Sequence, residues 1–152
     1  MQDIRRLPTR QVTAEKKEEA LLVPTMSAHM TPEYIVGKLF SYHNTAHFYH
    51  LQTDTIGKHL LLDELYKALV EFKDEIAEYL LGVQVPKRLD QVIIDQLLPY
   101  SDEHMLAFIN EGFNFSIALC EYAEAHNEEE LCNMASDLQK AFNKSRLFTT
   151  YK

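Results

Sequence analysis

Apolar residues recur three and four positions apart along most of the chain, which is the spacing of an amphipathic helix. This pattern predicts four long helices. The first spans about 31–51, where Thr, Pro and Glu form a favourable helix start. The second follows an interruption at 54–57 and closes at Gly82, a typical residue after a helix. A third helix is expected over about 101–125, and a fourth begins after 127 with its apolar stripe reaching Phe148.

The stretch between the second and third helices carries a weaker signal. Val92, Ile93 and Leu97 stand at helical spacing, which predicts a short crossover helix over 89–98 that ends before Pro99. The chain shows no strand pattern and no internal repeat. Four long helices with one long connection in the middle predict an all-α, ferritin-like four-helix bundle with a short crossover helix between its second and third helices.

The helical pattern occupies only part of the chain. We expect residues 1–30 to form an N-terminal tail and residues 31–152 to form one bundle domain. The tail mixes five positive charges with four negative ones, so a solvated extension is favoured and contact with DNA through residues 1–20 is weakly supported. The net charge of −8 also opposes tight nucleic-acid binding by the body of the protein.

Composition and the N-terminal residues indicate where in the cell the protein acts. The longest apolar runs are much shorter than the roughly 20 residues of a membrane span, so no membrane association is expected. The N-terminus lacks the apolar stretch of a secretory signal, which predicts a cytoplasmic location. Cys120 and Cys132 are therefore expected to be free thiols packed in the third and fourth helices.

Four acidic or imidazole side chains share one face of the second helix. Taking Asp63 as zero, His59 lies at about −40°, Asp74 at about +20° and Glu78 at about +60°. A face this narrow is where an amphipathic helix normally carries its core residues. Charged groups facing inward are costly unless they are paired or bind a cation, so the pattern indicates a metal site.

The spacing along the helix axis shows that one chain does not complete this site. Asp63 and Asp74 are 11 residues apart, about 16 Å along a helix, whereas ligand bonds reach only about 2–2.5 Å. A second copy of the helix, antiparallel across a two-fold axis near Leu69, would lay His59 and Asp63 of one chain beside Asp74 and Glu78 of the other. The spacing therefore predicts a homodimer with two equivalent shared sites.

His47 joins the other four residues through a resemblance to a known family. The stretch His47-Phe48-Tyr49, the His59/Asp63 pair and the segment Asp74-Glu75-Ile76-Ala77-Glu78 resemble motifs of the mini-ferritins, also called DNA-binding proteins from starved cells (Dps). The offsets from His47 match the ferroxidase ligands of that family at every position. Phe48 stands where the family usually has Trp.

The resemblance implies an activity, a cofactor set and an assembly. It implies that the following residues are both the metal ligands and the catalytic residues of an iron-oxidising centre: His47, His59 and Asp63 from one subunit, with Asp74 and Glu78 from its two-fold partner. Fe²⁺ would be oxidised by H₂O₂ or O₂ and stored as Fe³⁺ mineral in a hollow dodecamer, which protects against oxidative damage. Zn²⁺ or Mn²⁺ would compete for these ligands.

Other interpretations remain open from the residues alone. Asp63 and Asp74 also suit simple surface ion pairs with Lys67 and Lys73. In one alternative, the protein is an architectural, DNA-binding or structural assembly protein of the same fold, and its metal site is vestigial. A further alternative is a helical dimer in which Zn²⁺ or Mn²⁺ is purely structural. The bundle plan with metal inside each subunit is disfavoured, because no Glu has a His three residues later.

Overall fold

The computed structural model describes residues 30–83 and 88–150. Four helices account for most of this part of the chain: α1 (Pro32–His50), α2 (Ile56–Val83), α3 (Asp102–Ala125) and α4 (Glu129–Thr150). No strand occurs within these residues, which confirms the all-α prediction. None of the described helices is both long and apolar enough to cross a membrane.

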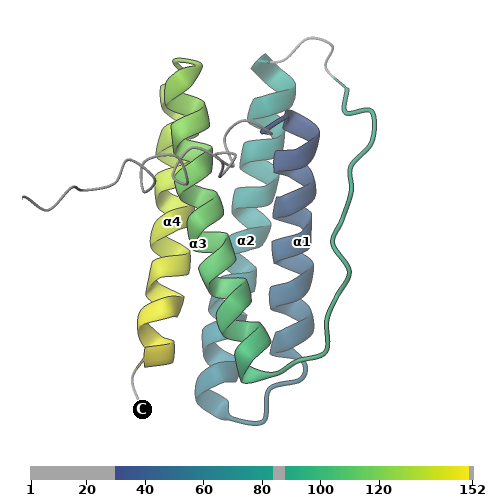
Figure 1. The fold of residues 1–152 in the computed structure, drawn as a ribbon, viewed down its shortest axis with the longest axis vertical. Coiled ribbons are helices and arrows are strands. Elements are labelled where there is room, and N and C mark those ends of the chain that lie inside the picture. Colours follow the sequence, from purple (N-terminus) through teal and green to yellow (C-terminus); the bar gives the residue numbers. More distant parts are fainter. Residues whose placement is uncertain (1–29, 84–87, 151–152) are drawn as a thin grey trace, which may run out of the picture.

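The four helices form two antiparallel pairs (Figure 1). α1 packs on α2 and α3 packs on α4, and the pairs are joined through contacts of α2 with α4 and of α1 with α3. Residues 88–101, which precede α3, run along the length of the bundle beside α1, and α2 and α3 point in the same direction. One long connection between two helical hairpins is the arrangement that the sequence predicts.

Side-chain capping explains where α1 and α3 begin. The Thr31 hydroxyl accepts a hydrogen bond from the Tyr34 N–H (3.2 Å), and the Ser101 hydroxyl accepts one from the His104 N–H (3.0 Å). Each bond satisfies one of the N–H groups that the first turn of a helix leaves without a partner. Thr31 and Ser101 thus fix the starts of α1 and α3, in agreement with the sequence prediction.

An aromatic cluster fills the centre of the bundle. The Tyr42 ring from α1 packs edge-on against Phe115 and Phe142, with ring centroids 5.3 Å and 5.5 Å away. Gly112 makes room for this packing, because a Cβ on it would overlap the Phe142 ring. The absence of a side chain at one position of α3 therefore allows an aromatic ring of α4 to pack directly against its backbone.

The crossover helix predicted over 89–98 is wrong. Residues 91–101 have no regular secondary structure, and we call residues 88–101 the strap because they lie against α1. The Asp95 N–H donates to the Ser41 hydroxyl (2.8 Å), and the Ile93 carbonyl lies so close to Gly37 that a Cβ there would clash with it. Contacts with α1 replace the hydrogen bonds of a helix, and β-branched residues favour extended backbone.

Two details at the ends of the elements also differ from the predictions. Gly82 lies inside α2 and does not close it, and no glycine among the described residues has a positive φ. Met30 was assigned to the tail, but its side chain is buried against the core. Residues 1–29, and with them the predicted DNA contacts of residues 1–20, lie outside the described residues.

The turn between α3 and α4 is tight and well bonded. Asn127 has a φ of 57°, a left-handed conformation that Asn tolerates better than most residues. The N–H of Glu128 donates to the Ala123 carbonyl (2.9 Å), and the N–H of Asn127 donates to the Glu124 carbonyl (3.1 Å). This pair of bonds is the Schellman motif, which ends α3 and directs the chain back along it.

Candidate metal-binding site

The five predicted ligands come from two helices. His47 lies in the last turn of α1, and the other four lie on α2: His59 and Asp63 in its first half, Asp74 and Glu78 in its second half. Because α1 and α2 are antiparallel neighbours, the end of α1 meets the beginning of α2. The fold therefore brings His47 to the same end of the bundle as His59 and Asp63.

The ligand face of α2 points away from the core, contrary to the prediction that it faces inward. The core face of α2 consists of fully or almost fully buried apolar residues, namely Leu62, Leu65, Leu69, Ile76 and Leu80. At 100° per residue this face is centred about 130° from the centre of the four ligands. We call the side of α2 that carries the ligands, with the adjoining part of α1, the outer face.

The outer face is polar, but it also carries exposed apolar side chains. Ile56 and Leu60 are 76% and 59% exposed, and helical geometry places them on the ligand side of α2. Asp63 retains 28% of its side-chain exposure and Asp74 retains 64%. Charged groups on this surface are hydrated in a single chain, so they need no cation until another surface covers them.

Aromatic and imidazole rings link the ligands of α1 and α2. The His47 ring stacks on Tyr66 with centroids 4.8 Å apart, and the His50 ring lies 4.0 Å from His59 and 5.5 Å from Tyr66. His50 thus belongs to this cluster, although the sequence analysis assigned it no role. Its position three residues after His47, on the same helical face, is the signal that was available.

The backbone sets the proton position on His59. Its Nδ1 lies 3.1 Å from the His50 carbonyl oxygen, and the His50 Nδ1 lies 3.2 Å from the His59 carbonyl oxygen. A carbonyl only accepts hydrogen bonds, so in each ring Nδ1 carries the proton and donates it. In neutral His59 this leaves the lone pair on Nε2, which is the form of imidazole that binds metals.

Both aspartates have lysine neighbours in the single chain. The Lys67 ammonium donates to Asp63 (2.6 Å), and this hydrogen bond, followed by the charges of Lys67, His50 and His59, lowers the pKa of Asp63. Lys73 lies 3.5 Å from Asp74. The surface ion pairs considered from the sequence are thus present, and a metal ion would have to compete with them. Such exposed pairs are weak because solvent screens them, and they stabilise the protein much less than a complete metal–ligand set does.

Glu78 is exposed, and the described part of the chain provides no hydrogen bond or ion pair to its carboxylate. His43 lies partly buried beside the cluster, 6.3 Å from His47 and 6.1 Å from Tyr66 between ring centroids. Burial, assisted by the charge of Lys73, lowers the pKa of His43. His43 is therefore biased toward its neutral, uncharged form.

One chain does not assemble the five ligands around a common point. Among the described residues, the only group of three or more His, Cys, Asp and Glu ligand atoms within 4.8 Å of one another involves Cys120, Glu124 and Cys132. His47, His59 and Asp63 lie at the same end of the outer face, but their ligand atoms do not form such a group. Asp74 and Glu78 lie further along the same helix.

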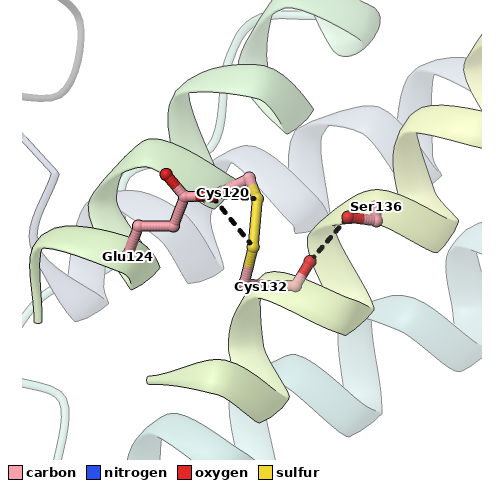
Figure 2. The surroundings of a disulfide bond; sticks show 4 residues. All are labelled: Cys120, Glu124, Cys132 and Ser136. Carbon is pink, nitrogen blue, oxygen red and sulfur yellow. Dashed lines mark hydrogen bonds between the residues drawn. A yellow bond between two sulfur atoms is a disulfide. The ribbon is translucent and has the colours of Figure 1, made fainter. Parts of the chain in front are cut away.

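The cysteine group is the feature that the sequence analysis missed. Cys120 of α3 and Cys132 of α4 form a disulfide, with Cα atoms 4.5 Å apart, so the expectation of free thiols is wrong (Figure 2). Both residues are six positions from His126 at the turn, and residues equidistant from a tight helical turn lie at the same level of the hairpin. That symmetry was available in the sequence.

Comparison with protein-family models, with curated proteins and with solved structures finds no match to this chain. The interpretation as a mini-ferritin therefore depends on the residues and their arrangement alone. The described residues form an all-helical, four-helix bundle whose outer face gathers histidines and carboxylates.

Proposed function

We propose that this protein is an iron-binding mini-ferritin that oxidises Fe²⁺ at sites shared between two subunits and stores the Fe³⁺ product. The observation that carries the proposal is the distribution of ligands on the outer face. His47, His59 and Asp63 gather at one end, while Asp74 and Glu78 follow on the same side of α2. Each end alone is an incomplete ligand set for iron, and a two-fold partner would supply the missing half.

The position of the ligands on the surface supports the shared site better than an inward position would. A partner can reach only exposed groups, and Asp74 and Glu78 are exposed. Exposed Ile56 and Leu60 give the same surface apolar area to bury against another copy. The midpoint between His59 and Glu78 coincides with the midpoint between Asp63 and Asp74, so a single two-fold axis pairs both sets at once.

The chemistry then follows from the ligand types. Imidazole nitrogen and carboxylate oxygen suit Fe²⁺, and carboxylates stabilise the Fe³⁺ that forms. With H₂O₂ as the oxidant, two Fe²⁺ ions give up one electron each, and the peroxide takes up two protons and leaves as two waters. The His59 Nε2 lone pair is oriented by the Nδ1–H bond to the His50 carbonyl, which holds one ligand in place before iron arrives.

The proposal extends to a hollow dodecamer in the cytoplasm that protects against oxidative damage. An anaerobic Fe²⁺ titration followed by peroxide addition tests it, with the oligomer mass measured on the same sample. The double variant Asp74→Ala/Glu78→Ala should lose rapid oxidation while the oligomer mass and helix content remain. Unchanged oxidation kinetics in this variant would contradict the proposal.

Mixing two inactive variants tests the sharing of the site. In a dimer of one Asp74→Ala/Glu78→Ala chain with one His59→Ala/Asp63→Ala chain, one site is intact and the other lacks all four residues. Random exchange of subunits makes half the dimers mixed, so about a quarter of the wild-type activity should return. Activity that does not return after verified subunit exchange would show that each site uses ligands of a single chain.

A further inference from the structure

The turn between α3 and α4 brings together side chains of the types that bind metals, at the opposite end of the bundle from the last turn of α1 that carries His47. Sulfur and oxygen atoms of Cys120, Glu124 and Cys132 all lie within 4.8 Å of one another. Figure 2 shows Glu124 extending from α3 toward the two sulfurs. One oxygen of its carboxylate, Oε1, is 3.9 Å from both Sγ atoms.

The Glu124 carboxylate is an unusual neighbour for the two sulfurs of a structural disulfide. Disulfide sulfurs carry no hydrogen, so in the oxidised state Glu124 has nothing there to accept a hydrogen bond from. In the reduced state both thiols would point hydrogens at it, and their ionisation would place three negative charges together. A bound cation is the arrangement that satisfies all three groups at once.

The segment that joins the two cysteines is strongly acidic. Between Cys120 and Cys132 the sequence contains five Glu residues and no Lys or Arg. Within the described part of the chain, Glu124 forms no ion pair with Lys, Arg or His. A divalent cation approaching this end of the bundle is therefore attracted, and no protein cation among the described residues competes for the carboxylate.

The α3–α4 hairpin holds the three residues in place without the disulfide. The Schellman bonds of Glu128 and Asn127 fix the turn, and the Ser136 hydroxyl donates to the Cys132 carbonyl (2.9 Å). Two thiolates bound to one Zn²⁺ at 2.3 Å in tetrahedral geometry are about 3.8 Å apart. The 4.5 Å separation of the Cα atoms accommodates this spacing after rotation about the Cα–Cβ bonds.

Space for a fourth ligand adjoins the group. An open hollow of about 420 Å³ reaches Cys132 and Glu124, and its other lining residues are Asn127, Glu128, Glu129 and Asn133. Water or one of these side-chain oxygens would complete a tetrahedral set. Two sulfurs with oxygen ligands favour a borderline or soft divalent cation over Mg²⁺ or Ca²⁺.

We infer that the reduced Cys120–Glu124–Cys132 group is a binding site for a zinc-class divalent cation, and that disulfide formation abolishes it. A low-molecular-weight thiol reduces the disulfide to two protein thiols and is itself oxidised to its disulfide. Binding of Zn²⁺ then displaces two protons. H₂O₂ reverses the process: the two thiolates give two electrons to its O–O bond, the S–S bond forms, two protons from the solvent complete two waters, and Zn²⁺ is released.

The test uses the full chain in a His59→Ala/Asp63→Ala background, which removes two of the five proposed iron ligands, and it reads a thiolate band that only the cysteine group can give. The protein is reduced with dithiothreitol, freed of it under anaerobic conditions, and titrated with Co²⁺ as a spectroscopic substitute for Zn²⁺. One equivalent of Co²⁺ should bind with a thiolate-to-cobalt charge-transfer band, Zn²⁺ should displace it, and H₂O₂ should abolish the band. The oxidised protein should show none.

Three variants identify the ligands. Cys132→Ser should eliminate the charge-transfer band, with helix content and oligomer mass checked to verify folding. Glu124→Gln retains both thiols and should weaken binding about tenfold. Glu121→Gln, one turn earlier on α3 with the same loss of charge, should bind as tightly as the parent. Absence of the band in the reduced parent, its persistence in Cys132→Ser, or equal affinities of Glu124→Gln and Glu121→Gln would overturn the assignment.

Discussion

The outer face and the Cys120–Glu124–Cys132 group differ in how much of each site one chain provides. The three atoms of the cysteine group already lie within 4.8 Å of one another. On the outer face, α2 alone separates Asp63 from Asp74 by about 16 Å of helix axis. In the two proposals, the first group requires only a change of redox state to bind a metal, whereas the second requires another subunit. If both proposals hold, a single fold carries one site controlled by oxidation and one controlled by assembly.

The largest expected effects come from removing the ligands of one site and assaying both. Asp74→Ala/Glu78→Ala should slow Fe²⁺ oxidation about 100-fold and leave Co²⁺ binding by the reduced cysteine group unchanged. Cys120→Ser/Cys132→Ser should abolish the cobalt charge-transfer band and leave Fe²⁺ oxidation within about twofold of wild type. Stopped-flow oxidation assays and cobalt titrations measure the two effects. Loss of both properties in either variant would show that the sites are not independent.

Substitution of two closely packed glycines should destabilise the fold, and only one of the two substitutions should also affect the cysteine group. Gly112→Ala forces a Cβ into the Phe142 ring, and Gly37→Ala forces one into the Ile93 carbonyl. Each should lower the free energy of unfolding by about 1–3 kcal/mol, more than the roughly 1 kcal/mol that Ala gains over Gly in a helix. Only Gly112→Ala should also weaken cobalt binding, because it separates α3 from α4.

Gly57→Ala is the matched control for these packing changes, since nothing lies within 4 Å of a Cβ at that position of α2. It should leave stability unchanged or raise it by up to about 1 kcal/mol. Urea unfolding followed by circular dichroism measures all three variants. If Gly112→Ala proved as stable as Gly57→Ala, the close packing of Phe142 on α3 would be contradicted.

A smaller effect is expected from the lysine that competes with Fe²⁺ for the Asp63 carboxylate on the outer face. Lys67→Met removes the ammonium group that occupies Asp63, which returns the pKa of Asp63 toward its ordinary value but leaves it ionised at pH 7. Because an exposed ion pair is weak and screened by solvent, Fe²⁺ should bind only about two- to fivefold more tightly. An anaerobic Fe²⁺ titration measures this change. Lys58→Met, which removes the partner of Asp102, is the control and should leave Fe²⁺ affinity unaltered.

The smallest expected effect is on the pH dependence of stability, and it comes from a tyrosine that contacts the α3–α4 turn. The Tyr79 hydroxyl donates to Glu128, and this hydrogen bond raises the pKa of Tyr79 to about 12. The folded protein then holds a proton that the unfolded chain releases near pH 10, so the stabilisation is complete below pH 10 and is lost as the pH rises to about 12. Tyr79→Phe should flatten the fall in melting temperature between pH 9 and pH 11. An identical fall in both proteins would contradict this contribution.

Much of the fold was predictable because local signals and tertiary structure agree. The N-caps at Thr31 and Ser101, the apolar periodicity and the long connection predict four helices, and the structure contains them. The strap was mispredicted because its conformation depends on α1: Gly37 and Ser41 provide the contacts that an isolated 89–98 segment lacks. Three apolar residues at helical spacing were too weak a signal against those contacts.

The sequence by itself determined which residues share a side of α2 and how far apart they stand, because helical geometry fixes angle and rise for every residue. It did not determine whether that side faces the core, since the direction depends on which surface the other helices cover. Only the tertiary structure placed the predicted ligands on the outer face, brought the His50 ring beside His59, and joined Cys120 to Cys132. Those three results arise from contacts between helices, which periodicity within one helix does not encode.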